Sequence, residues 1–432
     1  MHLLVVVSNY PHPGHPSSGA FNERSARALH ELKHRVEVLA PRPYVPRGLS
    51  ACHPRWRAYG RIPEREIRHG VIVYRPAYLQ VPGTGALLRP DWCAYRSCAR
   101  PLLARHQADP YDAILAFNLI GAGGLAWRLA GRLGVPAAGW ATGNDVRAAV
   151  RSAHGRAVRK ALQRLDLKFY QSAELLEHGA ALCGVSRQDL SSDHHLVLPR
   201  GVEPPPPAAA DTRRSVRAGL GVRPEQLLVL FVGRIVRAKG VFELVDAVAL
   251  ARRQGRDLVC ALVGAHAGFD DSVELCGRLR RTPELAPHVQ VLPACAPEAV
   301  APYLHAGDVF AFPSHREGMP NSLLEAMAAG LPALAYAIPP VLEIDHRLGA
   351  LKLVPPQDVG ELARALVELA DSPELRRRFG AQGQARVMSR YRMQASMAEA
   401  VRRLHAFPHE RATIESCSTG APMFSPRPRN PA

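Results

Sequence analysis

The chain has 432 residues, of which 47% are hydrophobic and 22% are charged, and its formal net charge is +17. This length predicts about two or three globular domains, and no uninterrupted apolar run approaches the roughly 20 residues that a membrane-spanning helix needs. The eight cysteines include no CxxC pair, so we expect neither disulfides nor structural zinc, and this usage is typical of a reducing cytoplasm.

The first half of the chain alternates short apolar runs with helical segments. The runs that we expect to be strands are LLVVVS, RVEVLAP, VIVYRP, DAILAF, VPAAGWAT, ALCGVS and HHLVLPRGV. Short β-branched runs with helices between them are typical of a parallel sheet that is covered on both faces.

Gly19 stands in the SSGAF turn before the first expected helix, which runs from about Ala20 to Leu32. Because glycine has no side chain, this position lets the backbone approach a phosphate closely at a helix N-terminus. An ordinary capped helix start explains the same residues.

The composition changes at VEPPPPAAADTRR, which predicts a stiff linker and a domain boundary near residue 205. A second series of strands follows: LLVLFVG, LVCALVG, HVQVLPA, DVFAFPS, LPALAYA and LKLVPP. The pattern predicts an α/β protein with two Rossmann-like domains, 1–204 and 205–387, that face a central cleft. Ligands of such sheets bind at the carboxyl ends of the strands. Residues 406–432 are rich in Pro, Ser and Arg, and we expect them to be disordered.

The segment FVGRIVRAKGVFELVDA places Gly233, Arg234 and Lys239 between a strand and a helix. Arginine can bind a phosphate through two parallel hydrogen bonds, and lysine supplies a point charge. At the edge of a cleft the two cations suit a diphosphate. The alternative is a solvated loop whose basic residues bind nothing.

The segment EGMPNSLLEAMAAG follows another strand, turns at Gly318 and begins a helix near Asn321 or Ser322. The free backbone N–H groups of such a helix start can hold a phosphate. Glu325, one turn further on, could accept from a ribose diol, and Glu317, before the turn, from a sugar hydroxyl. Alternatively, Glu325 only complements the helix dipole.

These two segments, GRIVRAKG and PSHREGMPNSLLEAMAAGLPALA, resemble the retaining glycosyltransferases of family four, which have the GT-B fold. The order and spacing match over residues 228–370, and ALCGVS, LPRGV and LFVGR extend the match to most of the chain except the tail. We also expect a C-terminal helix at about 388–405 to pack back on the first domain.

The resemblance implies roles for individual residues. Glu317 would contact the donor sugar, and Arg234 and Lys239 would neutralise the diphosphate; these three are the expected catalytic residues. The expected donor-binding residues are Gly19, Gly233, Gly318, Met319, Asn321, Ser322, Leu323 and Glu325.

The sequence departs from the family pattern on the acceptor side. In WATGNDV, Thr142 stands where the family has a histidine, and a second histidine position holds Phe117, followed by Asn118. Asn118, Thr142 and Asp145 remain candidate acceptor-side residues, although Asp145 is equally well explained as a helix N-cap. IPPVLEI replaces the usual glycine pair near residue 339, but Glu343 remains.

The expected function is transfer of a hexose from a nucleotide-diphosphate sugar to a glycan or lipid-linked saccharide, with retention of configuration, in cell-surface polysaccharide or glycolipid synthesis. The alternatives are a non-catalytic nucleotide-sugar-binding protein and a nucleotide-sugar epimerase or hydrolase of the same fold. A dinucleotide-dependent oxidoreductase is disfavoured, because the first turn, NYPHPGHPSSG, lacks GxGxxG.

The basic balance bears on partners. We expect a cytoplasmic protein, peripheral on an anionic inner membrane leaflet where lipid-linked acceptors present their sugars. No nucleic acid is expected, since no zinc finger, helix-turn-helix or stacked aromatic-basic module is visible. His12, His15, His194 and His195 lack the fixed spacing of metal ligands, so we expect no metal and no other cofactor.

Overall fold

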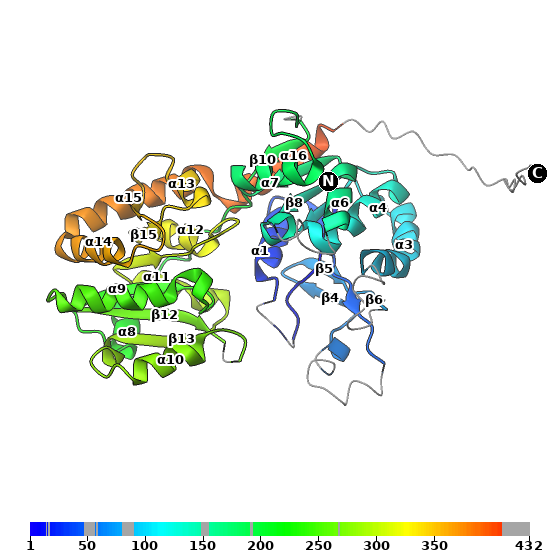
Figure 1. The fold of residues 1–432 in the computed structure, drawn as a ribbon. Coiled ribbons are helices and arrows are strands. Elements are labelled where there is room, and N and C mark those ends of the chain that lie inside the picture. Colours follow the sequence, from blue (N-terminus) through cyan, green and yellow to red (C-terminus); the bar gives the residue numbers. More distant parts are fainter. Residues whose placement is uncertain are drawn as a thin grey trace, which may run out of the picture.

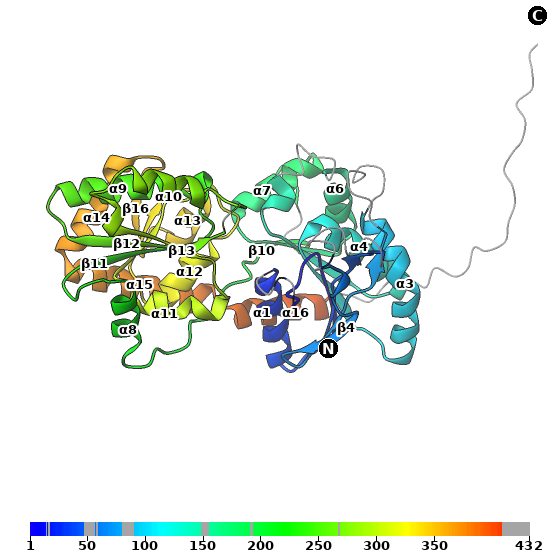
Figure 2. The ribbon, with the colours of Figure 1, turned by 90° about the horizontal axis from the view of Figure 1, so that it is seen from below.

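The computed structural model describes residues 1–13, 15, 18–46, 57, 59–79, 90–147, 155–190, 193–266 and 268–407. The described residues form two α/β domains that lie side by side, each built on a mainly parallel sheet with helices against it (Figures 1 and 2). The tail expected to be disordered, 406–432, lies outside the described residues from 408 onward. Within them, no helix is both long and apolar enough to cross a bilayer.

The N-terminal domain has an eight-stranded sheet in its described part, in the order β10-β9-β8-β7-β1-β2-β5-β4. The strands are β1 (His2–Val7), β2 (Arg35–Leu39), β4 (Arg65–Arg68), β5 (Val71–Tyr74), β7 (Ala113–Phe117), β8 (Ala137–Ala141), β9 (Leu167–Tyr170) and β10 (His195–Val197). All neighbours are parallel except β4 and β5, and β3 (Arg42–Pro43) and β6 (Ala77–Tyr78) form a separate pair. Every residue of β1 is buried, which explains its unbroken apolar sequence.

The helices of this domain connect its strands. They are α1 (Ala20–Glu31), α3 (Pro90–Ala108), α4 (Gly124–Leu133), α5 (Asn144–Arg147), α6 (Gly155–Arg164) and α7 (Ala173–Cys183), with a π-helical turn, η2, at Leu119–Gly123.

The C-terminal domain has a six-stranded parallel sheet in the order β13-β12-β11-β14-β15-β16. The strands are β11 (Leu227–Val232), β12 (Leu258–Ala265), β13 (Val289–Pro293), β14 (Val309–Phe312), β15 (Ala333–Tyr336) and β16 (Lys352–Val354). The helices are α8 (Thr212–Gly219), α9 (Val241–Arg253), α10 (Ser272–Arg280), α11 (Ala301–Ala306), α12 (Asn321–Ala328), α13 (Pro339–Asp345), α14 (Val359–Asp371) and α15 (Pro373–Arg390), with 3-10 turns at η4 (Arg237–Lys239), η5 (Ala286–His288) and η6 (Pro297–Ala299).

The strand order reverses between β1 and β7 in the first sheet and between β11 and β14 in the second. In open α/β sheets, the crevice at such a reversal is where ligands bind, outside the carboxyl ends of the strands. The fold therefore predicts that ligand-binding residues lie in the loops that follow these four strands.

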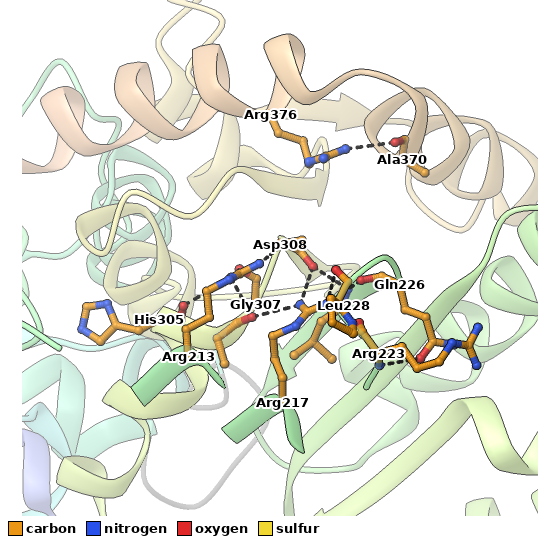
Figure 3. Close-up of polar contacts among 12 residues, drawn as sticks. Arg213, Arg217, Arg223, Gln226, Leu228, His305, Gly307, Asp308, Ala370 and Arg376 are labelled. Atoms are coloured by element: carbon orange, nitrogen blue, oxygen red, sulfur yellow. Dashed lines mark hydrogen bonds and ion pairs between the residues drawn. The ribbon is translucent and has the colours of Figure 1, made fainter. Parts of the chain in front are cut away.

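A polar network lies at the amino ends of β11 and β14, opposite the ends where ligands bind (Figure 3). Asp308, before β14, accepts hydrogen bonds from Leu228 N at 2.7 Å and from Arg217 Nη1 at 2.8 Å, and Arg217 Nη2 donates to Gln226 O at 2.6 Å. Burial raises the pKa of Asp308, but the bonds from Leu228, Arg213 and Arg217 outweigh burial and lower the pKa below its usual value. These bonds tie α8 to β11 and β14 far from the ligand edge.

One strand expectation in the first domain is wrong. ALCGVS is not a strand, because its first residues, 181–183, end α7 and Gly184 closes that helix in the left-handed region at φ 75°. The strand before β10 is instead β9, whose sequence LKFY carries a charged Lys168 in its interior. Ser172 explains the helix, since its side chain accepts from Leu175 N as an N-cap.

The last helix, α16 (Met393–His405), crosses back to the N-terminal domain and lies beside α1 (Figures 1 and 2). Its apolar residues share one core with the first sheet: Met393, Met397, Ala400, Val401 and Leu404. The helix expected at about 388–405 thus begins later, since residues to Arg390 continue α15. The chain turns at Tyr391, whose carbonyl accepts from Val202 N at 2.7 Å.

Candidate functional site

Two loops meet at the carboxyl ends of β11 and β14. Lys239, at the end of η4, forms an ion pair through Nζ with Glu317 Oε1. Ser314 Oγ donates to the same oxygen at 2.6 Å. Both charged side chains are largely shielded, with 24% of Lys239 and 11% of Glu317 exposed. The structure thus brings together a cation and an acid that are 78 residues apart in the sequence.

Gly240 fixes the position of Lys239. It has φ 67°, and a Cβ there would lie 1.9 Å from the carbonyl oxygen of Pro313. No other residue fits this close approach, because the clash is with backbone. The turn that carries Lys239 is therefore held against the end of β14.

Arg234 and Gly233 lie earlier in the same loop. Arg234 is exposed, and no described residue pairs with its guanidinium. The carbonyl of Gly233 is packed so closely on Gly264 that a Cβ at Gly264 would come within 2.1 Å. Of the two cations that the sequence predicts to bind a diphosphate, Lys239 is therefore paired and Arg234 has no partner among the described residues.

The start of α12 lies next to the Lys239–Glu317 pair in sequence and fold. The helix begins at Asn321, after Pro320, so the N–H groups of Ser322 and Leu323 belong to its first turn. The side chains of Met319 and Leu323 are buried in the core of the domain. For these two residues, only the backbone is placed to face a ligand.

Glu325 is held across the gap between the domains. Its Oε1 lies 2.6 Å from Arg24 Nη1, and 18% of the Glu325 side chain is exposed. Arg24 lies on α1, one turn after Gly19. Sequence reasoning missed Arg24, because a single arginine on an amphipathic helix carries no signal of a partner 301 residues away.

The domains also touch at backbone level. A Cβ on Gly318 would lie 2.4 Å from the carbonyl oxygen of Thr142, and one on Gly143 would lie 3.1 Å from Gly318 Cα. The loop after β8 thus packs on the turn before α12, and the acceptor-side candidates lie beside the donor-side ones.

Asp145 organises the loop after β8. Its carboxylate is fully buried and accepts from the backbone N–H groups of Leu119, Thr142, Gly143 and Val146 at 2.8–3.1 Å. Asn118 Nδ2 donates to Thr142 Oγ1 at 3.2 Å. Asp145 therefore holds the conformation of this loop, and its own side chain is not exposed to solvent.

A pocket of about 350 Å³ lies within the N-terminal domain beside Gly19, Asn118 and Thr142. Gly19 has φ 71°, and a Cβ there would lie 2.5 Å from Asn9 O. Arg200, from the LPRGV motif, also lines this pocket and is only 5% exposed. The LPRGV motif is part of the family resemblance, but nothing in its sequence indicates that its arginine is buried.

Glu343, on α13, joins the domains at another point. Its Oε2 accepts from Ala173 N at 2.8 Å, at the start of α7. Burial raises the pKa of Glu343. The prolines that replace the glycine pair occupy the first turn of α13, where they remove N–H donors from that helix start.

No group of three described His, Cys, Asp or Glu residues is arranged to hold a metal ion. The described histidines include His194 and His195, which line a separate pocket on the N-terminal domain with Lys168.

Comparison with known proteins places these features in context. The family described as glycosyl transferases group 1 matches residues 212–386, which contain the whole C-terminal sheet. TuaC of Bacillus subtilis, named for teichuronic acid biosynthesis, is 28% identical over 369 residues, covering 85% of this chain and 88% of that protein. A D-inositol 3-phosphate glycosyltransferase of Actinosynnema mirum is 30% identical over 310 residues, covering 66% of this chain and 70% of that enzyme.

Among solved structures, HepE of Anabaena in complex with UDP-glucose matches with a TM-score of 0.68 at 16% identity, covering 94% of this chain and 100% of that chain. At such low identity the likeness concerns the fold alone. It confirms the GT-B arrangement of two Rossmann-like domains that the sequence predicts.

Proposed function

Because the chain belongs to the glycosyl transferases group 1 family, we propose that it moves a hexose from a nucleotide-diphosphate sugar to a glycan or lipid-linked saccharide, with retention of configuration. The observation that carries this proposal is the pairing of Lys239 with Glu317 at the carboxyl ends of β11 and β14, beside the start of α12. At this end of the sheet, a cation can bind a diphosphate and an acid can accept a hydrogen bond from a sugar hydroxyl.

Negative charge builds on the diphosphate as it leaves the sugar. Lys239, the unpaired Arg234 and the first-turn N–H groups of α12 are the groups that stabilise this charge. A diphosphate replaces Glu317 as the partner of Lys239, and the carboxylate of Glu317 then accepts from a sugar hydroxyl. Glu325 exchanges Arg24 for the ribose diol in the same way.

Retention follows in this proposal from attack by the acceptor hydroxyl on the face that the diphosphate leaves. A departing phosphate oxygen takes the acceptor proton, since Asp145 is committed to backbone N–H groups and Glu317 accepts from Ser314 and from the sugar hydroxyl. The contact of Gly318 with Thr142 supports an arrangement in which the acceptor side closes on the donor side. In this proposal, closure excludes water from the reacting centre.

The acceptor class rests on the resemblance and on charge. The relative named for teichuronic acid biosynthesis supports a role in cell-surface polysaccharide or glycolipid synthesis. The net charge of +17 supports a cytoplasmic protein that is peripheral on an anionic leaflet, where lipid-linked saccharides are presented. No metal or other cofactor is part of the proposed reaction.

The test is a donor screen followed by kinetics of two lysine variants. UDP-, GDP- and ADP-sugars are titrated into the protein by calorimetry, and transfer or donor hydrolysis is then measured with the sugar that binds. We expect Lys239→Ala to lower kcat/KM by about 10²–10³, the effect of removing one preorganised donor from a developing charge. Lys352→Ala is the matched control, because Lys352 also pairs with a glutamate, Glu368, on the same domain but away from the site.

Equal kinetics for Lys239→Ala and the wild type would refute the assigned site. Donor binding without turnover on any acceptor supports the non-catalytic alternative. A free epimerised or hydrolysed sugar as the main product, with acceptor present, supports the epimerase or hydrolase.

A further inference from the structure

The pocket beside Gly19 lies at the carboxyl ends of β1, β7 and β8, on the side of the gap opposite the cations Arg234 and Lys239. Its lining includes Gly19, Asn22, Phe117, Asn118, Thr142 and Arg200. None of the described lining residues is acidic. The pocket therefore combines one fixed cation with neutral polar groups.

Arg200 is buried, and no described acid forms an ion pair with it. Its Nη1 donates to Asn22 Oδ1 at 2.8 Å, and no described residue accepts from its buried Nε. The rings of Phe21 and Phe117 lie 4.2 and 5.0 Å from the centre of the guanidinium. Burial of a charge without a counter-charge is costly, so such groups in proteins are paired or bind an ion.

Asp145 does not supply the missing counter-charge. It raises the pKa of Arg200 through space, but burial has the larger effect and lowers that pKa to about 9. The oxygens of Asp145 already accept from the N–H groups of Leu119, Thr142 and Gly143. The guanidinium of Arg200 thus has no ion-pair partner among the described residues, and it lines the pocket.

Other groups of the pocket suit an anion as well. Gly19 precedes α1, a helix of 12 residues whose first-turn N–H groups and dipole favour negative charge. Thr142 Oγ1 and the amide of Asn118 are half-buried polar groups at the rim. A phosphate or carboxylate accepts hydrogen bonds from such helix N–H groups and from an amide, and pairs with a planar guanidinium.

We propose that this pocket binds the phosphate or carboxylate of an acidic acceptor sugar, with Arg200 as the charged contact. The inference rests on the proposed function, and it names the acceptor class for the same site. The donor diphosphate is the other possible source of the anion. The acceptor is favoured because the pocket is lined by the N-terminal domain alone, whereas the proposed diphosphate contacts, Arg234 and Lys239, lie on the other domain.

The test measures anion binding with the donor site already filled. Wild-type protein is saturated with UDP, or with GDP or ADP if the donor screen selects one of them. Inorganic phosphate, glucuronate and glucose are then titrated separately by calorimetry. The same titrations are made with Arg200→Met, Arg200→Lys and Arg105→Met. Arg105 is the matched control, since its guanidinium also lies over a ring, that of Tyr74 at 3.6 Å, but outside the pocket.

We expect phosphate and glucuronate, but not glucose, to bind the wild type and Arg105→Met. Arg200→Met should weaken the two anions about tenfold or more, the scale of a lost charge-assisted hydrogen bond, and leave nucleotide affinity unchanged. The affinity of Arg200→Lys for the two anions should lie between those of the wild type and Arg200→Met. Lysine keeps the positive charge but loses the planar guanidinium. If Arg200→Met fails to fold, Arg200→Lys carries the comparison.

Two results overturn the proposal. Anion binding that is equal in the wild type and both Arg200 variants removes Arg200 from the site. A loss of nucleotide affinity in Arg200→Met assigns Arg200 to the donor diphosphate instead. Failure of the proposed function looks different, since no nucleotide then binds the wild type, whatever the anions do.

Discussion

Asp145 illustrates how much one buried carboxylate can determine. Its two oxygens accept from backbone N–H groups of four residues, in the loops after β7 and β8. An asparagine in its place keeps the shape but turns one acceptor into a donor that faces N–H groups. Buried donors that lose their acceptor cost free energy.

We therefore predict that Asp145→Asn lowers the free energy of unfolding by about 2–4 kcal/mol, measured by urea denaturation. Asp189→Asn is the control, because Asp189 also accepts from a nearby backbone N–H, that of Ser186, but in an exposed turn. It should change stability by no more than about 0.5 kcal/mol. Similar losses in both variants would contradict the role given to Asp145.

At the residue scale, the residues that can be predicted from sequence are those with a local signal. Lys239 and Glu317 lie in motifs whose residue types already suggest phosphate and sugar binding, and the fold brings them together. Arg24 and Arg200 were not found, because their significance comes from burial and from partners far away in the sequence. Phe117 and Thr142 stand where the family has histidines, but these replacements do not indicate that an arginine lines the same pocket.

Loops and helix starts are the elements that form the candidate site. The turn at Gly318 packs on the carbonyl of Thr142, and a Cβ there would lie 2.4 Å from that oxygen. Gly318 has no left-handed φ, so a side chain is excluded only by the other domain. A substitution at this position consequently acts on the approach of the domains more than on the folding of either.

Gly318→Ala should lower kcat/KM about tenfold or more, since a misplacement near 1 Å can cost that much, and should leave the thermal midpoint unchanged. Gly219→Ala is the matched control, because Gly219 lies on the same domain and a Cβ there meets nothing within 4 Å. Full activity in Gly318→Ala would show that the domains need not come this close for catalysis.

The anchor at Asp308 leads to a prediction about acid stability. The pKa of Asp308 is lower in the folded protein than its usual value of 3.8. Its stabilising contribution is therefore complete above about pH 5 and is lost as the pH falls through the lowered pKa. Asp308→Asn should lower the free energy of unfolding by about 3 kcal/mol at pH 6, because the substitution leaves Arg217 without its acidic partner. The loss should be smaller at pH 3.

Urea denaturation of the wild type and variant across this pH range measures the difference directly. Asp257→Asn is the control, since hydrogen bonding from Gln226 also lowers the pKa of Asp257, but its side chain is 40% exposed. A cost at Asp308 that is constant with pH would contradict the assignment.

Element assignment from sequence failed where a local pattern competed with tertiary structure. LKFY forms β9 although Lys168 interrupts its apolar run, because neighbouring strands on both sides supply the pairing. The apolar end of α7 was taken for a strand, because a short buried run fits either period. The remaining buried strands were recognisable from sequence since both faces of a parallel sheet need apolar residues.

At the scale of the whole molecule, α16 connects the end of the chain to the first domain (Figure 2). Met397 is fully buried in the core that includes β1 and α1, whereas Met388, on α15, is 38% exposed. The stability of the N-terminal domain therefore depends on residues that follow the C-terminal domain in sequence.

Met397→Ala should lower the free energy of unfolding by about 2–5 kcal/mol, the cost of a cavity at a buried methionine. Hydrogen exchange should show the loss of protection in β1 and α1, not in the C-terminal sheet. Met388→Ala is the control, with an expected change within about 0.5 kcal/mol. Protection lost mainly from β11 and β14 would contradict this packing.

The two-domain architecture could be predicted from sequence because strand and helix signals alternate in both halves. The pairing of Arg24 with Glu325 and the approach of Gly318 to Thr142 could not, since both arise only when the domains are placed together. The spacing of residues within a motif predicts the loops of one domain at a time. The candidate site is formed by loops of both domains.

The most direct measurement is a crystal structure of the protein with the nucleotide-diphosphate sugar that the donor screen identifies. The account predicts a diphosphate within hydrogen-bond distance of Lys239 and Arg234, a ribose on Glu325 and a sugar hydroxyl on Glu317. Density for the nucleotide sugar elsewhere, or these side chains turned away from it, would contradict the account.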